Sequence, residues 1–562
     1  MIIILLYFFL LIIILFPLGI GTSKLLSIKV KLPLDIVLLG LVTITIFSSL
    51  WMFFLPLAGL WSFSLIFLST VVFFYNRAEV YEQLKISKNN ILKLSFLNKL
   101  TLLFTLLAIV YCTSLPAYVI DNESYYIQTI KWLDKYGLVK GGLANLHVYL
   151  AQQSGFHILE AALNFDSVYD RFNDLSAFYL LIGVVWSLES DINDNHILKY
   201  YRKGLVVLSL ICFTFISAPS PDTAVYVLTY ILIYKFLKLW HHWDEKEFII
   251  LTFFCCQIIY FKVIMVLLFI LVIMIWLKYY QVKKNVSWML VGLLFLSLFI
   301  GKNLVVTGLP LFPLDYGIVT ETVWELPLSV SNFYNGITKA QAFGVSPKVI
   351  TEMNAFELSQ SWFFHSGLEG LLNKILLMSI LISFIFLFTK KVKPAIKCVL
   401  IVFLFHVIVL FVTSPQFRFF IPLLVPSAVL SGLLMFKLSH KTVNFLFLTF
   451  LFVGLIIATF TGLQNRLTDN DLMIRNYNLH ALNLLIQPAP KSIYPNDFKK
   501  VTKNELQYHS PLNNSFLYGT YNLPLPAVNE RYVEFMENKY QISIQKLGDS
   551  ISEGFKYVKI KN

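Results

Sequence analysis

Charged residues are scarce in this chain of 562 residues: Asp, Glu, Lys and Arg make up only 14%, whereas 57% of the residues are hydrophobic. A soluble globular domain carries about 25% charged residues. The composition therefore excludes an ordinary soluble protein. Apolar runs of about 17 to 20 residues recur along most of the chain, and each can cross roughly 30 Å of hydrocarbon. The sequence predicts an all-α polytopic membrane protein.

Cysteine is also rare, and its placement excludes two further kinds of site. None of the five cysteines has the spacing of a metal site, and all lie within apolar runs. The long loops and the C-terminal tail contain no cysteine, which excludes a disulfide framework there. We interpret the five as small buried hydrophobes. They are Cys112, Cys212, Cys255, Cys256 and Cys398.

The net charge of +13 does not predict a nucleic-acid partner, because the basic residues fall mainly in short loops between apolar runs. In such loops Lys and Arg set the orientation of a membrane protein. Met1 to Leu18 is apolar from its first residue and lacks both a basic start and a convincing cleavage site. We interpret this segment as a retained span rather than a signal peptide.

Hydropathy predicts about 14 spans in a transmembrane domain of residues 1–461. The spans are placed at 2–18, 36–55, 57–75, 101–119, 174–189, 204–218, 223–240, 248–261, 263–279, 286–301, 372–389, 395–413, 419–436 and 443–461. Alternation then puts six basic clusters on one side, which we take to be cytoplasmic. These clusters are Lys24, Lys29 and Lys31; Arg77, Lys85, Lys88, Lys93 and Lys99; Lys199, Arg202 and Lys203; Lys278, Lys283 and Lys284; Lys390, Lys391, Lys393 and Lys397; and Lys437 and Lys441.

Two long loops and the tail fall on the opposite, extracytoplasmic side. The loops are 121–173 and 302–373, and the tail is 462–562. Loops of this length are uncommon unless they are functional. The first loop is predicted to begin with an amphipathic helix that ends near Gly137, and a second short helix is predicted at 157–163. The tail has strand-like pieces at 540–544 and 555–560, which predict a small α+β appendage.

An acidic pair opens the first outer loop. Asp121 and Glu123 follow directly after the apolar run 102–120. Carboxylates at the mouth of a membrane span are costly, which favours a functional role. Partial loss of water raises the basicity of a carboxylate, so either acid is a candidate general base for proton abstraction from a hydroxyl. The alternative is an acid that stabilises a helix N-terminus.

Cations that suit a phosphate group lie at the same predicted level. Lys262, Arg418 and Lys302 are the candidates, and Arg418 offers the bidentate geometry that phosphate prefers. Their alternatives are structural anchors and snorkelling side chains. Asp222 follows a Ser-Pro-Ser-Pro turn, and it is either a helix N-cap or a second acid that faces the same pocket.

Polar residues of the first loop complete the candidate site. His147, His157 and Gln128 are candidate substrate contacts, although two histidines ten residues apart are not a metal signature. Asp121 and Asp222 are the candidate ligands of a divalent cation, Mg²⁺ or Mn²⁺. Together the acids can activate a hydroxyl and the cations can hold a lipid phosphate and stabilise it as a leaving group.

Several blocks resemble a family of uncharacterised bacterial polytopic membrane proteins, from about residue 120 to the C-terminus. The blocks are 121–132, 141–146, 217–222, 307–313, 415–419 and 548–555. Gln416 stands where that family tends to have an acid, and the tail lacks the cysteines that its members often carry. An acidic pair in the first large outer loop also resembles the GT-C superfamily of glycosyltransferases.

The GT-C resemblance implies a bacterial cytoplasmic-membrane enzyme whose active site faces outward. Its donor would be a polyprenyl-phosphate-linked sugar, and its acceptor an envelope glycan or a lipid-linked acceptor in contact with membrane lipids. One alternative is an envelope polysaccharide polymerase or ligase. The other is a flippase or transporter for a lipid-linked glycan, which is expected to place its polar residues near the middle of the bilayer.

Overall fold

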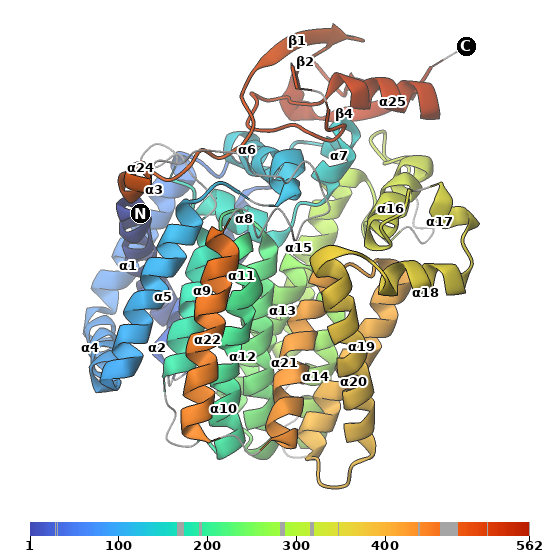
Figure 1. Ribbon diagram of the computed structural model, residues 1–562. Coiled ribbons are helices and arrows are strands. Elements are labelled where there is room, and N and C mark those ends of the chain that lie inside the picture. The colour runs from blue at the N-terminus through green and yellow to red at the C-terminus, as the bar shows by residue number, and fades with distance from the viewer. Residues whose placement is uncertain are drawn as a thin grey trace.

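The structure is a computed structural model in which helices form a tall bundle and short elements cover one of its ends (Figure 1). It describes residues 1–560 except for 29, 31, 118, 166–173, 190–193, 281–286, 315–319, 347, 437–438, 461–480 and 514. Five of the predicted basic residues, Lys29, Lys31, Lys283, Lys284 and Lys437, lie outside the described residues.

Within the described ranges, nine helices are long and apolar enough to cross a membrane. They are α1 (Ile2–Leu25), α2 (Pro33–Trp51), α5 (Phe96–Ser114), α12 (Pro221–His241), α15 (Ser287–Thr307), α19 (Gly367–Phe388), α20 (Pro394–Thr413), α21 (Phe417–Met435) and α22 (His440–Thr459). The pair α3 (Leu60–Tyr75) and α4 (Arg77–Lys93) is bent by 90° and adds a tenth if it is one span. These helices indicate a multi-pass membrane protein.

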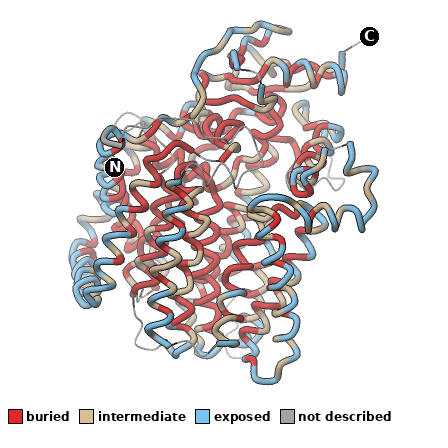
Figure 2. The backbone as a smooth tube through the Cα atoms, in the orientation of Figure 1, coloured by how far each residue is buried: buried red, intermediate tan, exposed pale blue. Residues whose placement is uncertain are grey.

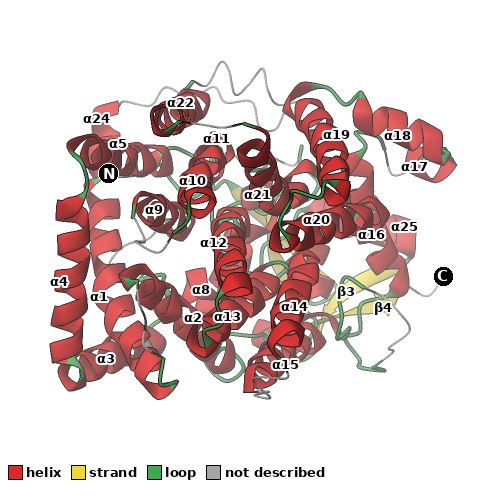
Figure 3. Ribbon diagram, turned by 90° about the horizontal axis from the view of Figure 1, so that it is seen from below, coloured by secondary structure: helices red, strands yellow, loops and turns green. Residues whose placement is uncertain are grey.

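The predicted count of 14 spans is not confirmed. Several of the predicted spans correspond to shorter elements, and two of them, 204–218 and 263–279, are divided between a 3₁₀ turn and an α-helix. The shorter elements of this region are α9 (Leu175–Leu188), α10 (His196–Gly204), η3 (Leu205–Leu208), α11 (Ser209–Phe215), α13 (Glu245–Phe261), η4 (Val263–Leu268) and α14 (Phe269–Tyr279). They pack among the long helices in the view along the bundle (Figure 3).

Short helices and the tail gather at one end of the bundle, at the top of Figure 1. The first loop contributes η1 (Asn122–Tyr126), α6 (Ile127–Tyr136), α7 (Leu143–Leu146), η2 (Val148–Ala151) and α8 (Gly155–Ala162). The second contributes α16 (Leu328–Ala342), α17 (Val349–Glu352) and α18 (Ala355–Phe363). The prediction of a helix that ends at Gly137 is confirmed, since Gly137 follows α6 with a φ of 67°.

The described tail is α+β, as predicted. It contains α24 (Ala481–Ile486), β1 (Phe498–Lys503), β2 (Leu506–Pro511), α25 (Glu530–Tyr540), β3 (Ile542–Lys546), η6 (Ile551–Glu553) and β4 (Phe555–Lys559). Strands β1 and β2 pair antiparallel with Val501 opposite Tyr508, and β3 and β4 pair antiparallel with Ile544 opposite Tyr557. The two predicted strand-like pieces form the second pair.

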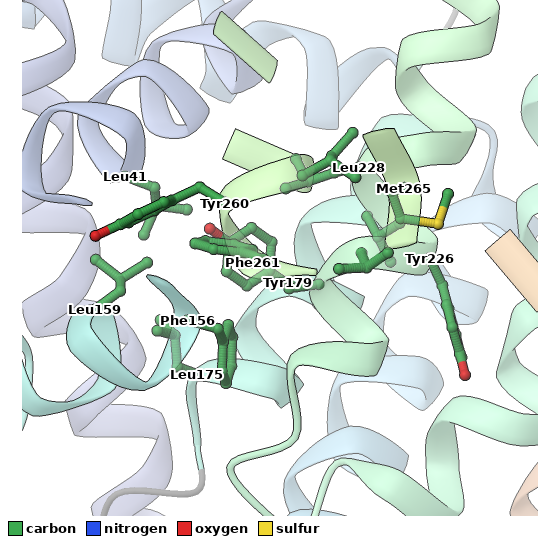
Figure 4. Packing of buried hydrophobic residues seen from close by; sticks show 14 of the residues in the cluster. Leu41, Phe156, Leu159, Leu175, Tyr179, Tyr226, Leu228, Tyr260, Phe261 and Met265 are labelled. Atoms are coloured by element: carbon green, nitrogen blue, oxygen red, sulfur yellow. The ribbon is translucent and has the colours of Figure 1, made fainter. Parts of the chain in front are cut away.

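Buried residues fill the bundle and continue into the outer layer, whereas exposed residues follow its outside (Figure 2). An aromatic contact ties the two parts together. The ring of Phe156 in α8 lies 5.6 Å from that of Phe261 in α13 and 6.2 Å from that of Tyr179 in α9 (Figure 4). Offset and edge-on aromatic contacts at such distances stabilise packing beyond the area they bury. The first outer loop is thus anchored on the bundle.

The described basic clusters meet at the other end of the bundle. Lys24 of α1 pairs with Glu79 of α4 at 2.5 Å. Lys203 donates a hydrogen bond to Asn444, in the first turn of α22. His241, at the end of α12, lies close to the charged groups of Lys278 and Lys393. These contacts bring described parts of the clusters together in pairs, and a shared cytoplasmic side for all six stays a prediction.

Cysteine labelling tests this orientation. Lys391→Cys lies in the exposed hairpin between α19 and α20, and Asn513→Cys lies in the exposed part of the tail. A membrane-impermeant maleimide added to intact cells is expected to label the tail site and not the hairpin site, because positive loops stay inside. The native cysteines are buried except Cys398, which is partly exposed and needs replacement by serine. Labelling of both sites, or of the hairpin alone, contradicts the orientation.

Candidate active site

The acidic pair follows α5 at the start of the first outer loop, and its two side chains contact different parts of the protein. Asp121 directly precedes the π-helical turn η1, and Glu123 lies within it. A π turn rotates successive side chains differently from an α-helix and is frequent at functional sites. Asp121 contacts the transmembrane bundle, whereas Glu123 is buried against the tail.

Asp121 forms an ion pair with Arg418, although 297 positions separate them in the chain. Oδ2 of Asp121 lies 2.5 Å from Nη1 of Arg418, and the two side chains keep 16% and 21% of their surface exposed. Arg418 lies in the first turn of α21, and its Nε donates to Oε1 of Gln416 at 2.9 Å. The hydroxyl of Tyr226 donates to the backbone oxygen of Arg418 at 2.9 Å. The arginine is therefore held in place while its charge stays accessible.

A second ion pair lies beside the first. Lys262, between α13 and η4, pairs with Oδ1 of Asp222 in the first turn of α12. The N-cap of α12 is Ser220 rather than Asp222, which leaves the Asp222 carboxylate available for the lysine. The ring of Phe419 touches both cations, with its centroid 4.4 Å from Nζ of Lys262 and 5.2 Å from Cζ of Arg418. Two acids and two cations thus surround one aromatic ring.

A long cavity of about 1330 Å³ opens from the first ion pair. Asp121, Arg418 and Gln416 line its outer end, together with Gln341 and His365 from the second outer loop. The remaining lining residues are mostly apolar, with Tyr200 and Lys203 of α10 as polar exceptions. They come from α10, η3, α11, α19, α21 and α22. Drug-sized ligands occupy pockets of about 300–1,000 Å³, so this cavity suits a larger ligand with one polar end.

Glu123 contacts the tail instead of this cavity. Its carboxylate accepts hydrogen bonds from Oγ of Ser492 at 2.5 Å, Nδ2 of Asn122 at 2.9 Å and the backbone N–H of Ile493 at 3.3 Å. Its backbone oxygen accepts from the N–H groups of Thr520 and Tyr521. Burial raises the pKa of Glu123. The role of Glu123 as a base stays a prediction, and its contacts favour a structural one.

The remaining predicted polar residues fall into three places. Gln128 donates to the backbone oxygens of Tyr521 and Leu523 in the tail, at 3.0 Å each. Lys302 donates to the backbone oxygen of Gln153, close to η2. His147 packs against the ring of Tyr532 in α25, with ring centroids 4.6 Å apart. These contacts favour structural roles for all three.

His157 is closest to the ion pairs. Its ring centroid lies 4.8 Å from that of Tyr126, whose hydroxyl donates to Oδ2 of Asp121 at 3.4 Å. Burial lowers the pKa of His157 to about 3, and it does the same for His147. Both imidazoles are therefore neutral at neutral pH and are weak bases compared with a carboxylate.

Sequence reasoning missed the tyrosines and the ring that organise the site. Tyr126 and Tyr226 contact Asp121 and Arg418, and the ring of Phe419 contacts both cations. The one available signal was adjacency, because Tyr126 follows the acidic pair closely and Phe419 follows Arg418 directly. Tyr226 stands one turn after Asp222 in α12, which places both on the same helix face.

No group of three or more His, Cys, Asp or Glu side chains is placed to hold a metal ion among the residues that the structure describes. Asp121 and Asp222, the candidate metal ligands, each face a cation of the protein. A Mg²⁺ or Mn²⁺ ion would need to compete with these cations. The divalent cation stays a prediction.

Glycines permit the close contact between the tail and the first outer loop. The N–H of Phe555 donates to the backbone oxygen of Gly141 at 3.1 Å, and Nδ2 of Asn145 donates to the backbone oxygen of Phe555. Gly554 has a φ of 105°, and a Cβ there would lie 1.7 Å from the oxygen of Gly141. A side chain at this position is excluded both by the backbone conformation and by the neighbouring backbone.

Gly554→Ala is expected to release the tail, because the added methyl group overlaps the backbone oxygen of Gly141. Unlike a flexible side chain, this backbone atom cannot rotate away. The expected result is faster cleavage of the tail by a protease while the transmembrane bundle stays intact, measured on purified protein by gel analysis. Gly336→Ala is the matched control, since a Cβ there meets no atom within 4 Å. Equal cleavage in the two variants contradicts the role of Gly554 in docking.

A family described as a domain of unknown function (DUF8201) matches residues 1–425. The chain belongs to this family. The matched range contains Asp121, Asp222, Lys262 and Arg418, and it ends before the tail. Neither a curated protein nor a solved structure matched the chain.

Proposed function

We propose that the protein is a GT-C-like membrane glycosyltransferase of the bacterial cytoplasmic membrane. It transfers a sugar from a polyprenyl-phosphate donor to an envelope glycan or a lipid-linked acceptor on the extracytoplasmic face. One observation carries the proposal: the Asp121–Arg418 pair lies at the polar end of a long apolar cavity. A ligand that matches both parts has an anionic head and a long hydrocarbon chain.

The residues suit direct displacement at the sugar. The acceptor hydroxyl oxygen forms a bond to the anomeric carbon while the bond from that carbon to the phosphate oxygen breaks. The hydroxyl proton passes to the carboxylate of Asp121, and the polyprenyl phosphate leaves with the bonding electrons. Arg418 stabilises the charge that develops on the leaving phosphate. Attack from the face opposite the phosphate inverts the configuration of the anomeric carbon.

The existing ion pair links donor binding to activation of the base. Arg418 contacts Asp121 directly, so an incoming phosphate competes with this carboxylate for the guanidinium. When Nη1 of Arg418 turns to the phosphate, the Asp121 carboxylate is released and can accept the hydroxyl proton. Gln416 contacts Nε of the same arginine and Tyr226 contacts its backbone oxygen, so the rest of the residue keeps its position. Donor binding thus frees the acid.

Lys262 contacts the same Phe419 ring as Arg418 and supplies a second cation beside it. Its partner Asp222 keeps the pair neutral when no ligand is bound, which lowers the cost of holding a charge at the edge of the hydrocarbon. We assign Lys262 to the donor phosphate and Asp222 to the positioning of Lys262.

Two alternative functions share part of this site. A polysaccharide polymerase or ligase uses the same lipid-linked donors, and the acceptor separates it from the proposed enzyme. A flippase needs a polar route for the head group. Between the ion pair and α10 the cavity walls are mostly apolar, and moving an unpaired polar head along them is costly. This observation favours the glycosyltransferase.

Reconstitution tests the proposal. The purified protein in proteoliposomes is supplied with radiolabelled polyprenyl-phosphate sugars and with lipid extracts or envelope glycan as acceptor. Label is expected to move from the donor to the acceptor, with no requirement for a nucleotide. A donor panel of hexoses and pentoses identifies the sugar. Movement of intact labelled donor between leaflets without any transfer supports the flippase instead.

A further inference from the structure

The apolar part of the cavity follows one helix from end to end. On α21 the lining residues include Arg418, Ile421, Val425, Gly432 and Phe436, which recur at helical spacing and so form a single face. At 1.5 Å per residue, the distance from Arg418 to Phe436 is roughly 27 Å. The hydrocarbon core of a bilayer is about 30 Å thick. This groove is therefore long enough to cross almost the whole hydrocarbon core rather than one leaflet.

The opposite wall is mostly apolar as far as its inner end, where Tyr200 and Lys203 of α10 join the lining. Residues of η3 and α11 face α21 on one side, and Phe447 and Ile457 of α22 close the other. Thr214, a polar residue within this stretch, gives its hydroxyl hydrogen to the backbone oxygen of Ile211 at 2.6 Å and is satisfied locally. Figure 3 shows α22 and α19 at the edge of the bundle, with α11, α10 and α21 beside them.

We infer that this groove binds the single isoprenoid chain of the donor in an extended form across both leaflets, so that the enzyme selects long-chain lipid phosphates. The inference rests on the proposed function, because it takes the donor phosphate to be at Arg418. Arg418 at the outer end and the apolar stretch between it and Lys203 match an anionic head and one long chain. An acyl chain of a phospholipid reaches only to the middle of the bilayer and leaves the inner half of the groove empty.

Gly432 is the position at which chain length can be tested. It lies near the inner end of the groove, and a Cβ there meets no atom within 4 Å. Gly432→Phe is therefore expected to fold and to fill the inner part of the groove with its ring. Met435→Phe is the matched control, because Met435 lies in the same last turn of α21, is 52% exposed and does not line the groove.

The assay measures binding of two lipid phosphates without a sugar, in nanodiscs. One is a polyprenyl phosphate whose extended chain exceeds the hydrocarbon thickness, and the other is farnesyl phosphate. Lipid tails are as apolar as the groove, so the preference arises from van der Waals contacts along the walls. We expect the wild type and Met435→Phe to bind the long chain about tenfold more tightly, a difference of about 1.4 kcal/mol. Gly432→Phe is expected to lose this preference and to bind farnesyl phosphate unchanged.

Three results would overturn the inference: equal wild-type affinity for both chains, wild-type chain preference in Gly432→Phe, or displacement of the long chain by equimolar phosphatidylglycerol. The two proposals fail separately. Chain preference that Gly432→Phe removes, in a protein that transfers no sugar, supports the groove and counts against the enzyme. Sugar transfer that proceeds equally from short and long donors supports the enzyme and overturns the groove.

Discussion

Asp121→Asn is expected to lower the rate of sugar transfer by about 10²–10⁴-fold, the usual contribution of a positioned general base. The substitution keeps the size and polarity of the side chain and removes the proton acceptor. It also frees Arg418 from its carboxylate, which lies 2.5 Å away. The KM for the donor is therefore expected to stay constant or fall while kcat drops. A residue that only positions Arg418 would instead raise the KM.

Glu123→Gln is the matched control for this experiment, because it makes the same chemical change two residues away. The amide oxygen can accept from Asn122 and Ile493, and the amide nitrogen can donate to the hydroxyl of Ser492. We expect near-normal transfer and an unchanged melting temperature. A large loss of transfer in Glu123→Gln with full activity in Asp121→Asn would reverse the roles of the two acids. Full activity in both would remove the acidic pair from catalysis.

The divergence of these two acids shows what the sequence leaves open. The sequence predicts that Asp121 and Glu123 lie together at the mouth of a span, and the structure places them there. Two positions apart on a helical turn, they point in nearly opposite directions, and which of them faces the bundle depends on how the turn at Asn122–Tyr126 is placed. The partner of each acid is also distant, since Arg418 lies 297 residues from Asp121 and Ser492 lies 369 residues from Glu123.

The membrane class was predictable because it depends only on composition and apolar runs. The number of spans was harder to predict. Apolar runs such as 204–218 and 263–279 look like spans, yet each is divided between a 3₁₀ turn and an α-helix. Hydropathy averages over such breaks. Contacts between basic clusters of different loops were expected from alternation, which does not depend on exact boundaries.

The pairing of cations with acids was partly predictable. The sequence places Lys262, Arg418, Asp121 and Asp222 at one level of the membrane, and the structure joins them into two pairs. The sequence does not reveal that Gln128 contacts the tail or that Lys302 contacts Gln153, because those contacts depend on how the tail and η2 fold back. The cavity was not predictable either, since its walls come from helices distant in sequence.

Arg418→Ala is expected to weaken binding of a polyprenyl phosphate by about 100-fold, because a hydrogen bond to a charged group contributes about 1.5–3 kcal/mol. Arg418→Lys keeps the charge and loses the planar fork that contacts Asp121 and Gln416 together, so a loss of about tenfold is expected. Affinity is measured with the lipid phosphate alone. Lys374→Ala is the control, since Lys374 is an exposed cation near the outer end of α19 and does not line the cavity.

Arg418→Ala leaves the charge of Asp121 without its partner, and a fold defect caused by that charge would also weaken binding. A second variant controls for this effect. Removing one partner of a buried pair is more destabilising than removing both. The double variant Asp121→Asn/Arg418→Gln removes both charges and is expected to melt at a higher temperature than Arg418→Ala. If the double variant melts like the wild type and still fails to bind, the arginine itself holds the phosphate. If it binds with wild-type affinity, Arg418 is a structural partner of Asp121 and the donor phosphate lies elsewhere.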